Sequence, residues 1–172
     1  MRRFGVVGLA ALLLAGCTTG LQRTPDFFQI PQGFVGWVLV EYRVKDAPLL
    51  ELRDGYRVLP IPVGGILKTS SEQQQGWAKD IHKFVDTGGR LTDLPQTGWG
   101  KGGLVWGGSV SGGEVGVSFA REGQKAITCD IQTSPSLKFF IGTEAQYQRA
   151  VEVGGSPLTP AERAMNNTLR CP

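Results

Sequence analysis

The sequence has few of the residues that most often perform chemistry. Its 172 residues include one histidine, His82, and three cysteines. Zinc sites need several histidine or cysteine ligands at short spacings, and the D-x-[DN]-x-[DN]-G pattern of a calcium loop does not occur. The sequence therefore predicts no metal site and no cofactor.

Charge of one sign is not in excess either. The chain carries 18 basic and 15 acidic residues, and two of the basic ones are Arg2 and Arg3 at its start. Without these two arginines the net charge is near +1, and no basic cluster remains that would bind a phosphate backbone. We therefore expect no nucleic-acid partner.

The chain also lacks an apolar run long enough to span a bilayer, which needs about 20 residues. Met1-Arg2-Arg3 is instead followed by a short apolar run over residues 4–14 and by Ala15-Gly16-Cys17, which is the three-part layout of an export signal. The segment Leu14-Ala15-Gly16-Cys17 resembles the lipobox of bacterial lipoproteins, where a peptidase cuts before a lipid-modified cysteine. The resemblance implies that residues 1–16 are a signal peptide and that Cys17 is lipidated.

The same resemblance implies a location in the bacterial cell envelope. Each buried methylene of an acyl chain contributes about 0.8 kcal/mol, so two or more chains on Cys17 would hold the protein stably on a membrane. Thr18 stands where the usual signal for inner-membrane retention has aspartate, and we therefore expect the outer membrane. Two alternatives remain open: an ordinary signal peptide with an incidental cysteine, and an anchor helix that is never cut.

Two cysteines, Cys129 and Cys171, remain once Cys17 carries lipid. An even pair of cysteines in an oxidising compartment predicts a disulfide bond. Closing this loop would stabilise the fold by roughly 4 kcal/mol in the chain-entropy model. The alternative is two independent thiols.

Glycine is abundant, with 25 residues, and many of them alternate with Trp, Val and Phe between Gly88 and Gly123. Such a mixture is typical of turns between short strands and not of a flexible linker. We expect one hairpin over Asp54-Gly55 and another over Gly112-Gly113. Apolar alternation and turn signals predict strands over residues 34–44, 49–53, 56–61, 66–69, 82–85, 104–110, 115–120, 125–131 and 137–141.

Two capping boxes predict helices near the C-terminal end. Thr143-Glu144-Ala145-Gln146 begins a helix over residues 144–152, and Thr159-Pro160-Ala161-Glu162 begins a second helix that runs to about residue 169. The predicted fold class is therefore mainly β, an antiparallel sandwich or open barrel with one or two C-terminal helices. We assign residues 17–30 to a lipidated tether and residues 31–172 to a single β-rich domain.

Three residues are candidates for ligand binding. Trp99 has glycine on both sides and so has few sequence neighbours to pack against, which favours an exposed aromatic contact. The hydroxyls of Ser70 and Ser71 either cap a turn or bind the polar groups of a ligand, and we favour capping. The pattern G-x-G-x-x-G over residues 98–103 lacks the strand before it and the helix after it that a dinucleotide site needs, so it indicates a turn.

Several short motifs lie at the start of the predicted domain and near its end. They are Pro31-Gln32-Gly33-Phe34-Val35-Gly36, Tyr42, Ala47-Pro48, Asp54-Gly55-Tyr56, Gly65-Ile66-Leu67-Lys68-Thr69-Ser70-Ser71 and, further on, Phe140-Ile141-Gly142-Thr143 with Tyr147. Through these motifs residues 31–71 resemble a family of bacterial domains that has no assigned function. The resemblance implies a shared β fold and a bacterial source, and it carries over no catalytic residue.

No residue is assigned a catalytic role. Asp80 and His82 lie close together, and Ser70 and Ser71 precede them, so a Ser-His-Asp arrangement in space stays open; the G-x-S-x-G nucleophile elbow, however, is absent. We predict a non-enzymatic envelope module that is held on the membrane by its N-terminal lipid and that binds an envelope protein, a glycan or another ligand, or supports envelope structure. The alternatives are an envelope-polymer hydrolase that uses His82, and an immunity or inhibitor lipoprotein.

Overall fold

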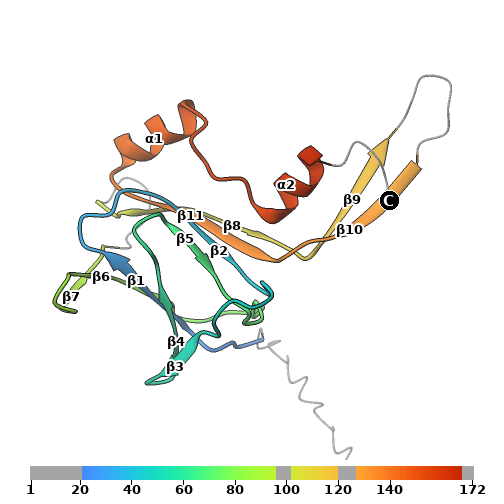
Figure 1. Ribbon diagram of the computed structural model, residues 1–172. Helices are drawn as coiled ribbons and strands as arrows, with labels where there is room; N and C mark the ends of the chain where they lie inside the picture. The colour runs from blue at the N-terminus through green and yellow to red at the C-terminus, as the bar shows by residue number, and fades with distance from the viewer. Residues whose placement is uncertain (1–20, 96–101, 120–126, 168–172) are drawn as a thin grey trace, which may run out of the picture.

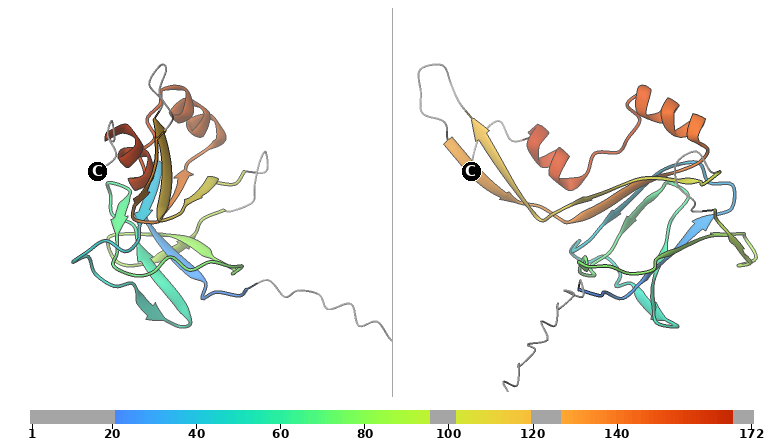
Figure 2. Two further views of the ribbon diagram at one scale, coloured as in Figure 1. Left: turned by 90° about the vertical axis from the view of Figure 1, so that its right-hand side faces the viewer. Right: turned by 180° about the vertical axis from the view of Figure 1, so that it is seen from behind.

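The computed structural model describes residues 21–95, 102–119 and 127–167. These residues form a mainly β structure with two short helices near the C-terminal end (Figure 1). Two sheets form an open sandwich, and a third sheet of two strands extends away from it (Figure 2). The predicted fold class is confirmed.

The first sheet has five strands in the order β3-β4-β1-β6-β7. The central strand β1 runs parallel to both of its neighbours, β4 and β6. The outer pairs, β3 with β4 and β6 with β7, are antiparallel. The bounds are Asp26–Pro31 for β1, Glu51–Arg53 for β3, Tyr56–Pro60 for β4, Ile81–Val85 for β6 and Leu91–Asp93 for β7.

The second sheet has four strands in the order β5-β2-β11-β8. Here β11 is antiparallel to β2 and β8, whereas β5 is parallel to β2. Both sheets are thus mixed, although we expected antiparallel pairing throughout, because apolar alternation does not distinguish the direction of a neighbouring strand. The bounds are Gly36–Glu41 for β2, Ile66–Lys68 for β5, Val105–Ser111 for β8 and Ser136–Ile141 for β11.

The core lies between these two sheets. Alternate residues of β1 point into it, so Phe28 and Ile30 are buried while the residues between them are less so. From the second sheet, Phe139 meets Phe28 edge to face, with ring centroids 5.2 Å apart. The buried residues that form one apolar cluster are Phe28, Ile30, Val38, Val40, Tyr42, Leu59, Ile61, Leu94, Phe139 and Ile141.

The folded domain begins earlier than we predicted. Residues 17–30 were assigned to a tether, but β1 starts at Asp26 and is the central strand of the first sheet. Gln22 already forms a parallel bridge with Trp77. The prediction missed β1 because the strand is short and includes charged and amide residues at two of its six positions.

The expected hairpin over Gly112-Gly113 is wrong, because the chain continues there in the same direction. The strands on either side are β8 and β9 (Glu114–Phe119), which pair with β11 and β10 (Ile127–Gln132) respectively. The N–H of Thr133 donates to the carbonyl of Gly113 at 2.7 Å, so pairing persists across the link. The strands β9 and β10 form an arm that stands away from the sandwich (Figure 1).

Two local predictions are confirmed in detail. The hairpin of β3 and β4 turns over Asp54 and Gly55, whose φ angles of 51° and 80° are those of a type I′ turn. Helix α1 (Glu144–Glu152) begins with the expected capping box, in which Thr143 and Gln146 bond to each other's backbone N–H groups.

Both helices lie over the outer face of the second sheet (Figure 2). Tyr147 of α1 stacks on Trp106 and also contacts Trp37 and Phe140 edge-on or tilted. Helix α2 (Pro160–Asn167) is held by the ion pair of Arg163 with the buried Glu41, at 2.7 Å. Within the described ranges, no helix is long and apolar enough to cross a membrane.

Two neighbouring glycines, Gly64 and Gly65, test how closely the chain before β5 approaches β2. Gly65 has a φ of +76°, and a Cβ there would lie 2.3 Å from the backbone oxygen of Trp37, whereas a Cβ at Gly64 would meet nothing within 4 Å. We expect Gly65→Ala to lower the free energy of unfolding by about 2 kcal/mol or more and Gly64→Ala to change it by less than about 1 kcal/mol. Urea denaturation of both variants measures this, and equal stabilities would contradict the close approach of Gly65 to the backbone of Trp37.

Candidate binding site

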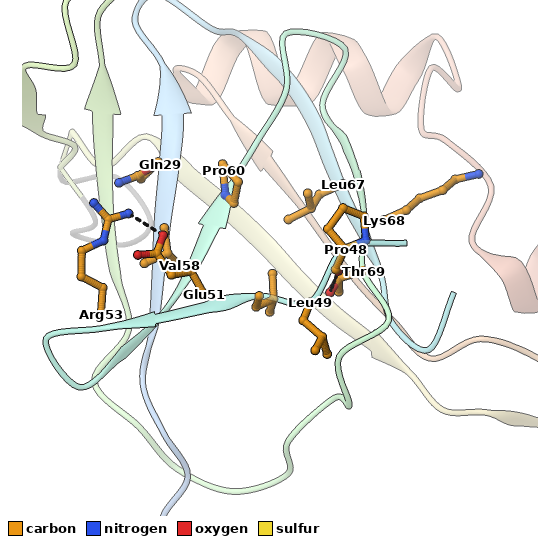
Figure 3. A pocket seen from close by; sticks show the side chains of 11 residues that line it. Gln29, Pro48, Leu49, Glu51, Arg53, Val58, Pro60, Leu67, Lys68 and Thr69 are labelled. Carbon is orange, nitrogen blue, oxygen red and sulfur yellow. Dashed lines mark hydrogen bonds and ion pairs between the residues drawn. The ribbon is translucent and has the colours of Figure 1, made fainter. Parts of the chain in front are cut away.

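A cleft of 270 Å³ opens on one side of the sandwich, where β3 and β5 are the edge strands of their sheets (Figure 3). The side chains that line it are mostly apolar, with Glu51, Arg53 and Lys68 adding charge. This volume is near the lower limit of ligand pockets, about 300 Å³, so the cleft fits one or two side chains or a small ligand. Its lining residues are Gln29, Pro48, Leu49, Leu50, Glu51, Arg53, Val58, Pro60, Leu67, Lys68 and Thr69.

The segment that includes Ser70 and Ser71 fixes one wall of this cleft. The buried hydroxyl of Thr69 donates to the carbonyl of Pro48 at 2.7 Å, and the hydroxyl of Ser71 accepts from the N–H of Leu50 at 2.8 Å. The N–H of Ser70 bonds to the same Pro48 carbonyl at 3.2 Å. The Ser71 hydroxyl therefore bonds to a distant segment and not to an adjacent turn, and it positions Leu50, which lines the cleft.

A network of charged side chains lines a small polar cavity of 160 Å³ at the start of β1. Asp26 is 2% exposed and accepts two hydrogen bonds from Arg57, from Nε at 2.8 Å and from Nη2 at 3.0 Å. Arg23 bridges Asp26 and Asp80. Asp80 in turn accepts from the backbone N–H of Asp26 at 2.8 Å. The network thus joins β1, β4 and the segment that leads into β6.

Burial dominates the electrostatics of this network. Desolvation raises the pKa of Asp26, and the charges of Arg57 and Arg23 only partly oppose the rise. Burial also raises the pKa of Tyr42, whose ring lies under the Arg57 guanidinium at 6.0 Å from its centroid. Burial acts to lower the pKa of Arg23, but the hydrogen bond and the charge of Asp80 outweigh it and raise that pKa.

The structure places Asp80 and His82 in one shallow recess of 170 Å³ on another side of the sandwich. His82 stacks on Phe28 with ring centroids 4.5 Å apart and contacts Phe139 edge to face. Asp80 is bound to Arg23, and neither Ser70 nor Ser71 lines the recess. The two serines that the sequence analysis considered are therefore not placed beside Asp80 and His82 in this recess. No group of three or more His, Cys, Asp or Glu residues that could hold a metal occurs in the described ranges.

Several predicted positions lie outside the described residues. These are Cys17, Trp99 and Cys171. The backbone of Cys129 is part of β10, whose partner β9 contacts α2, the last described element before Cys171. Because Cys171 lies outside the described residues, the disulfide stays a prediction.

The sequence analysis missed two parts of this region. It did not foresee the cleft, because the two edge strands that border it belong to different sheets and meet only in the tertiary structure. It also missed the charge network, although Asp26 offers a signal in retrospect: it shares the parity of Phe28 and Ile30 in β1, so a folded β1 buries it.

A comparison with protein families gives a match that begins where the described fold begins, at Gln22. The model of a family of unknown function, DUF6843, matches residues 22–134, which is more than half of the chain. The chain belongs to the DUF6843 family. The match supports the resemblance of residues 31–71 to a domain family without assigned function, and its range also includes the Gly-rich middle of the chain.

A solved structure shares the fold of this DUF6843 member. It comes from Bacillus anthracis, is described as a "putative lipoprotein", and has 19% sequence identity and a TM-score of 0.50, covering 84% of this chain and 90% of its own. At that identity the similarity shows a common fold and no more. No curated protein shows significant sequence similarity to the chain.

Two arginines of one hairpin test the charge network. Arg57→Met leaves the buried Asp26 without its two-bond partner, so we expect the free energy of unfolding to fall by about 3 kcal/mol at neutral pH. The exposed Arg53, which pairs with Glu51 at 3.1 Å, is the control, and Arg53→Met should cost under about 1 kcal/mol.

The loss of folding stability in Arg57→Met should depend on pH. A carboxyl whose folded pKa is raised favours folding most below its unfolded pKa of 3.8, and this contribution is lost as the pH rises through the folded pKa. Removing Arg57 raises that pKa further, so the defect should be smaller at about pH 4 than at pH 7. Denaturation at both pH values checks this, and equal losses for the two arginine variants would contradict the network's importance.

Proposed function

We propose that this DUF6843 member is a lipid-anchored lipoprotein of the bacterial cell envelope, with Cys17 as its lipidated N-terminus and the outer membrane as its location. The observation that carries the proposal is a lipobox-like segment, Leu14-Ala15-Gly16-Cys17, placed directly before a folded domain that begins near residue 22. The description of the structural neighbour as a lipoprotein supports the same conclusion.

We further propose that the sandwich is a non-enzymatic binding module and that the cleft between β3 and β5 is its ligand site. An edge strand presents unpaired backbone N–H and C=O groups, and two such strands border this cleft. The apolar lining supplies the contact area, and the edge backbone and charged side chains supply polar contacts. The cleft therefore suits an apolar side chain presented by an envelope partner.

The hydrolase remains the second candidate because Asp80 and His82 line one recess. In that hypothesis His82 would act as the general base, the role that histidine most often has in hydrolases. The stacking of His82 on Phe28 and the ion pair of Asp80 with Arg23 favour a structural role for both residues instead.

Metabolic labelling tests the lipid anchor. Cells that express the full chain with labelled palmitate should yield a labelled, membrane-bound protein, because the acyl chains are attached to Cys17. Cys17→Ser should give an unlabelled protein that accumulates as an uncleaved precursor. Cys129→Ser serves as the control and should keep the label. Equal labelling of the wild type and Cys17→Ser would contradict the anchor.

Two exposed leucines test the ligand site. Leu49 is 75% exposed and lines the cleft, whereas Leu52 is 68% exposed and does not. We expect Leu49→Asp to weaken binding by tenfold or more, because it places a charge in an apolar contact, and Leu52→Asp to leave binding unchanged. Isothermal titration with a panel of short peptides and envelope glycans first identifies a ligand of the wild type, and then compares the variants.

His82→Gln completes that comparison. The substitution keeps size and polarity, so a binding module should retain its affinity. The wild type could instead turn over a compound of the panel. If His82→Gln loses that turnover while its circular dichroism spectrum is unchanged, the protein is a hydrolase and the binding-module proposal is wrong. Equal effects of Leu49→Asp and Leu52→Asp on binding would contradict the proposal that the cleft is the ligand site.

A further inference from the structure

Two residues with large, exposed apolar side chains lie on hydrogen-bonded backbone segments at the N-terminal end of the domain. Leu21 is 79% exposed and Trp77 is 67% exposed. The N–H of Trp77 donates to the carbonyl of Leu21 at 2.8 Å, and the N–H of Arg23 donates to the carbonyl of Trp77 at 3.2 Å. Single exposed apolar residues are common, but these two lie together where the chain enters the fold.

This pair is held in place by its backbone and does not depend on a loose loop. Gly76 has a φ of +119°, and a Cβ there would lie 2.1 Å from the carbonyl oxygen of Leu21, so only glycine allows the two segments to approach this closely. Arg23 Nε donates to the carbonyl of Gly76 at 3.2 Å, and the side chain of Gln74 accepts from the N–H of Thr24 at 3.0 Å. The fold therefore presents Trp77 outward.

The position of the lipid makes the bilayer the natural partner of this surface. Only four residue steps separate Cys17 from Leu21, and an extended chain spans at most about 14 Å over that length. The interfacial region on each side of a bilayer is roughly 5–8 Å thick, between the hydrocarbon core and water. A lipid on Cys17 therefore keeps Leu21 and Trp77 within reach of the headgroups.

We propose that Leu21 and Trp77 dock on the phospholipid surface and orient the domain on its membrane. This inference rests on the proposed lipid anchor at Cys17. Tryptophan favours the membrane–water interface because its ring is apolar and its indole N–H is polar. Exposed Lys79 lies near Trp77 in the sequence and adds attraction to anionic headgroups.

Docking in this orientation has a consequence for the rest of the molecule. Helices α1 and α2 and the arm of β9 and β10 lie at the opposite end of the domain from residues 21–23, as all three views show (Figures 1 and 2). They therefore face away from the bilayer to which the chain is anchored.

Fluorescence quenching in reconstituted vesicles tests this docking. The mature lipidated protein is placed in vesicles of phosphatidylethanolamine and phosphatidylglycerol, with a fraction of the lipids brominated near the headgroup. We expect strong quenching of the wild type and at least half of it to be lost in Trp77→Phe. Trp37→Phe is the matched control and should keep the quenching, since Trp37 packs between Phe140 and Tyr147 beneath α1.

The outcomes separate this inference from the proposed function. A lipidated wild type that floats with the vesicles but shows the same quenching as Trp77→Phe would overturn the docking and leave the anchor intact. Full quenching of Trp77 by aqueous iodide in the vesicle-bound state would also overturn it, because the side chain would then face water. A wild type that carries no lipid would overturn the anchor and the docking together.

Discussion

The buried carboxylate of Asp26 is the constraint on which the rest of the structure depends. It occupies the position in β1 that points into the molecule, where an unpaired charge would be very costly. Arg57 from β4 and Arg23 from the entering chain form ion pairs with this carboxylate and offset its desolvation, and Arg23 also pairs with Asp80. Three segments that are far apart in the sequence are thereby fixed around one side chain.

The placement of these segments explains both surfaces that carry the proposed function. Arg57 holds β4 against β1, and β4 supplies one side of the cleft through Val58 and Pro60. Arg23 and Asp80 hold the entering chain against the segment of Gly76 and Trp77, which sets the outward direction of the indole. The proposed ligand site and the proposed membrane-facing surface are therefore positioned by the same network, although they lie on different parts of the domain.

The sequence was informative where structure is decided locally. Asp54-Gly55 predicted a type I′ turn and Thr143 with Gln146 predicted a helix start, because a few adjacent residues determine these geometries. Where pairing depends on distant strands, the sequence was a poor guide. It gave no sign that β1 is central and parallel to β4 and β6, or that β9 leaves β8 to form the arm.

The candidate site shows the same division. The hydroxyls of Ser70 and Ser71 were expected to cap a turn or to bind a ligand. The bond of the Ser71 hydroxyl to Leu50, which fixes a wall of the cleft, was not foreseen, because residues 48–50 and β5 meet only in the fold. Asp80 and His82 attracted attention as a possible catalytic pair because they are close in sequence. In the fold, their partners are Arg23 and Phe28, which the sequence places more than 50 residues away.

Hydrogen–deuterium exchange of the domain tests most directly whether the charge network fixes the entering chain. Asp80→Ala removes one of the two carboxylate partners of Arg23 and the acceptor of the Asp26 N–H, and it changes no residue of the apolar core. We predict that the amides of Arg23 and Trp77 exchange at least tenfold faster in this variant, while those of β2 and β11 keep their rates. Unchanged exchange at Arg23 and Trp77 would contradict the account, because the entering chain would then be held without the network.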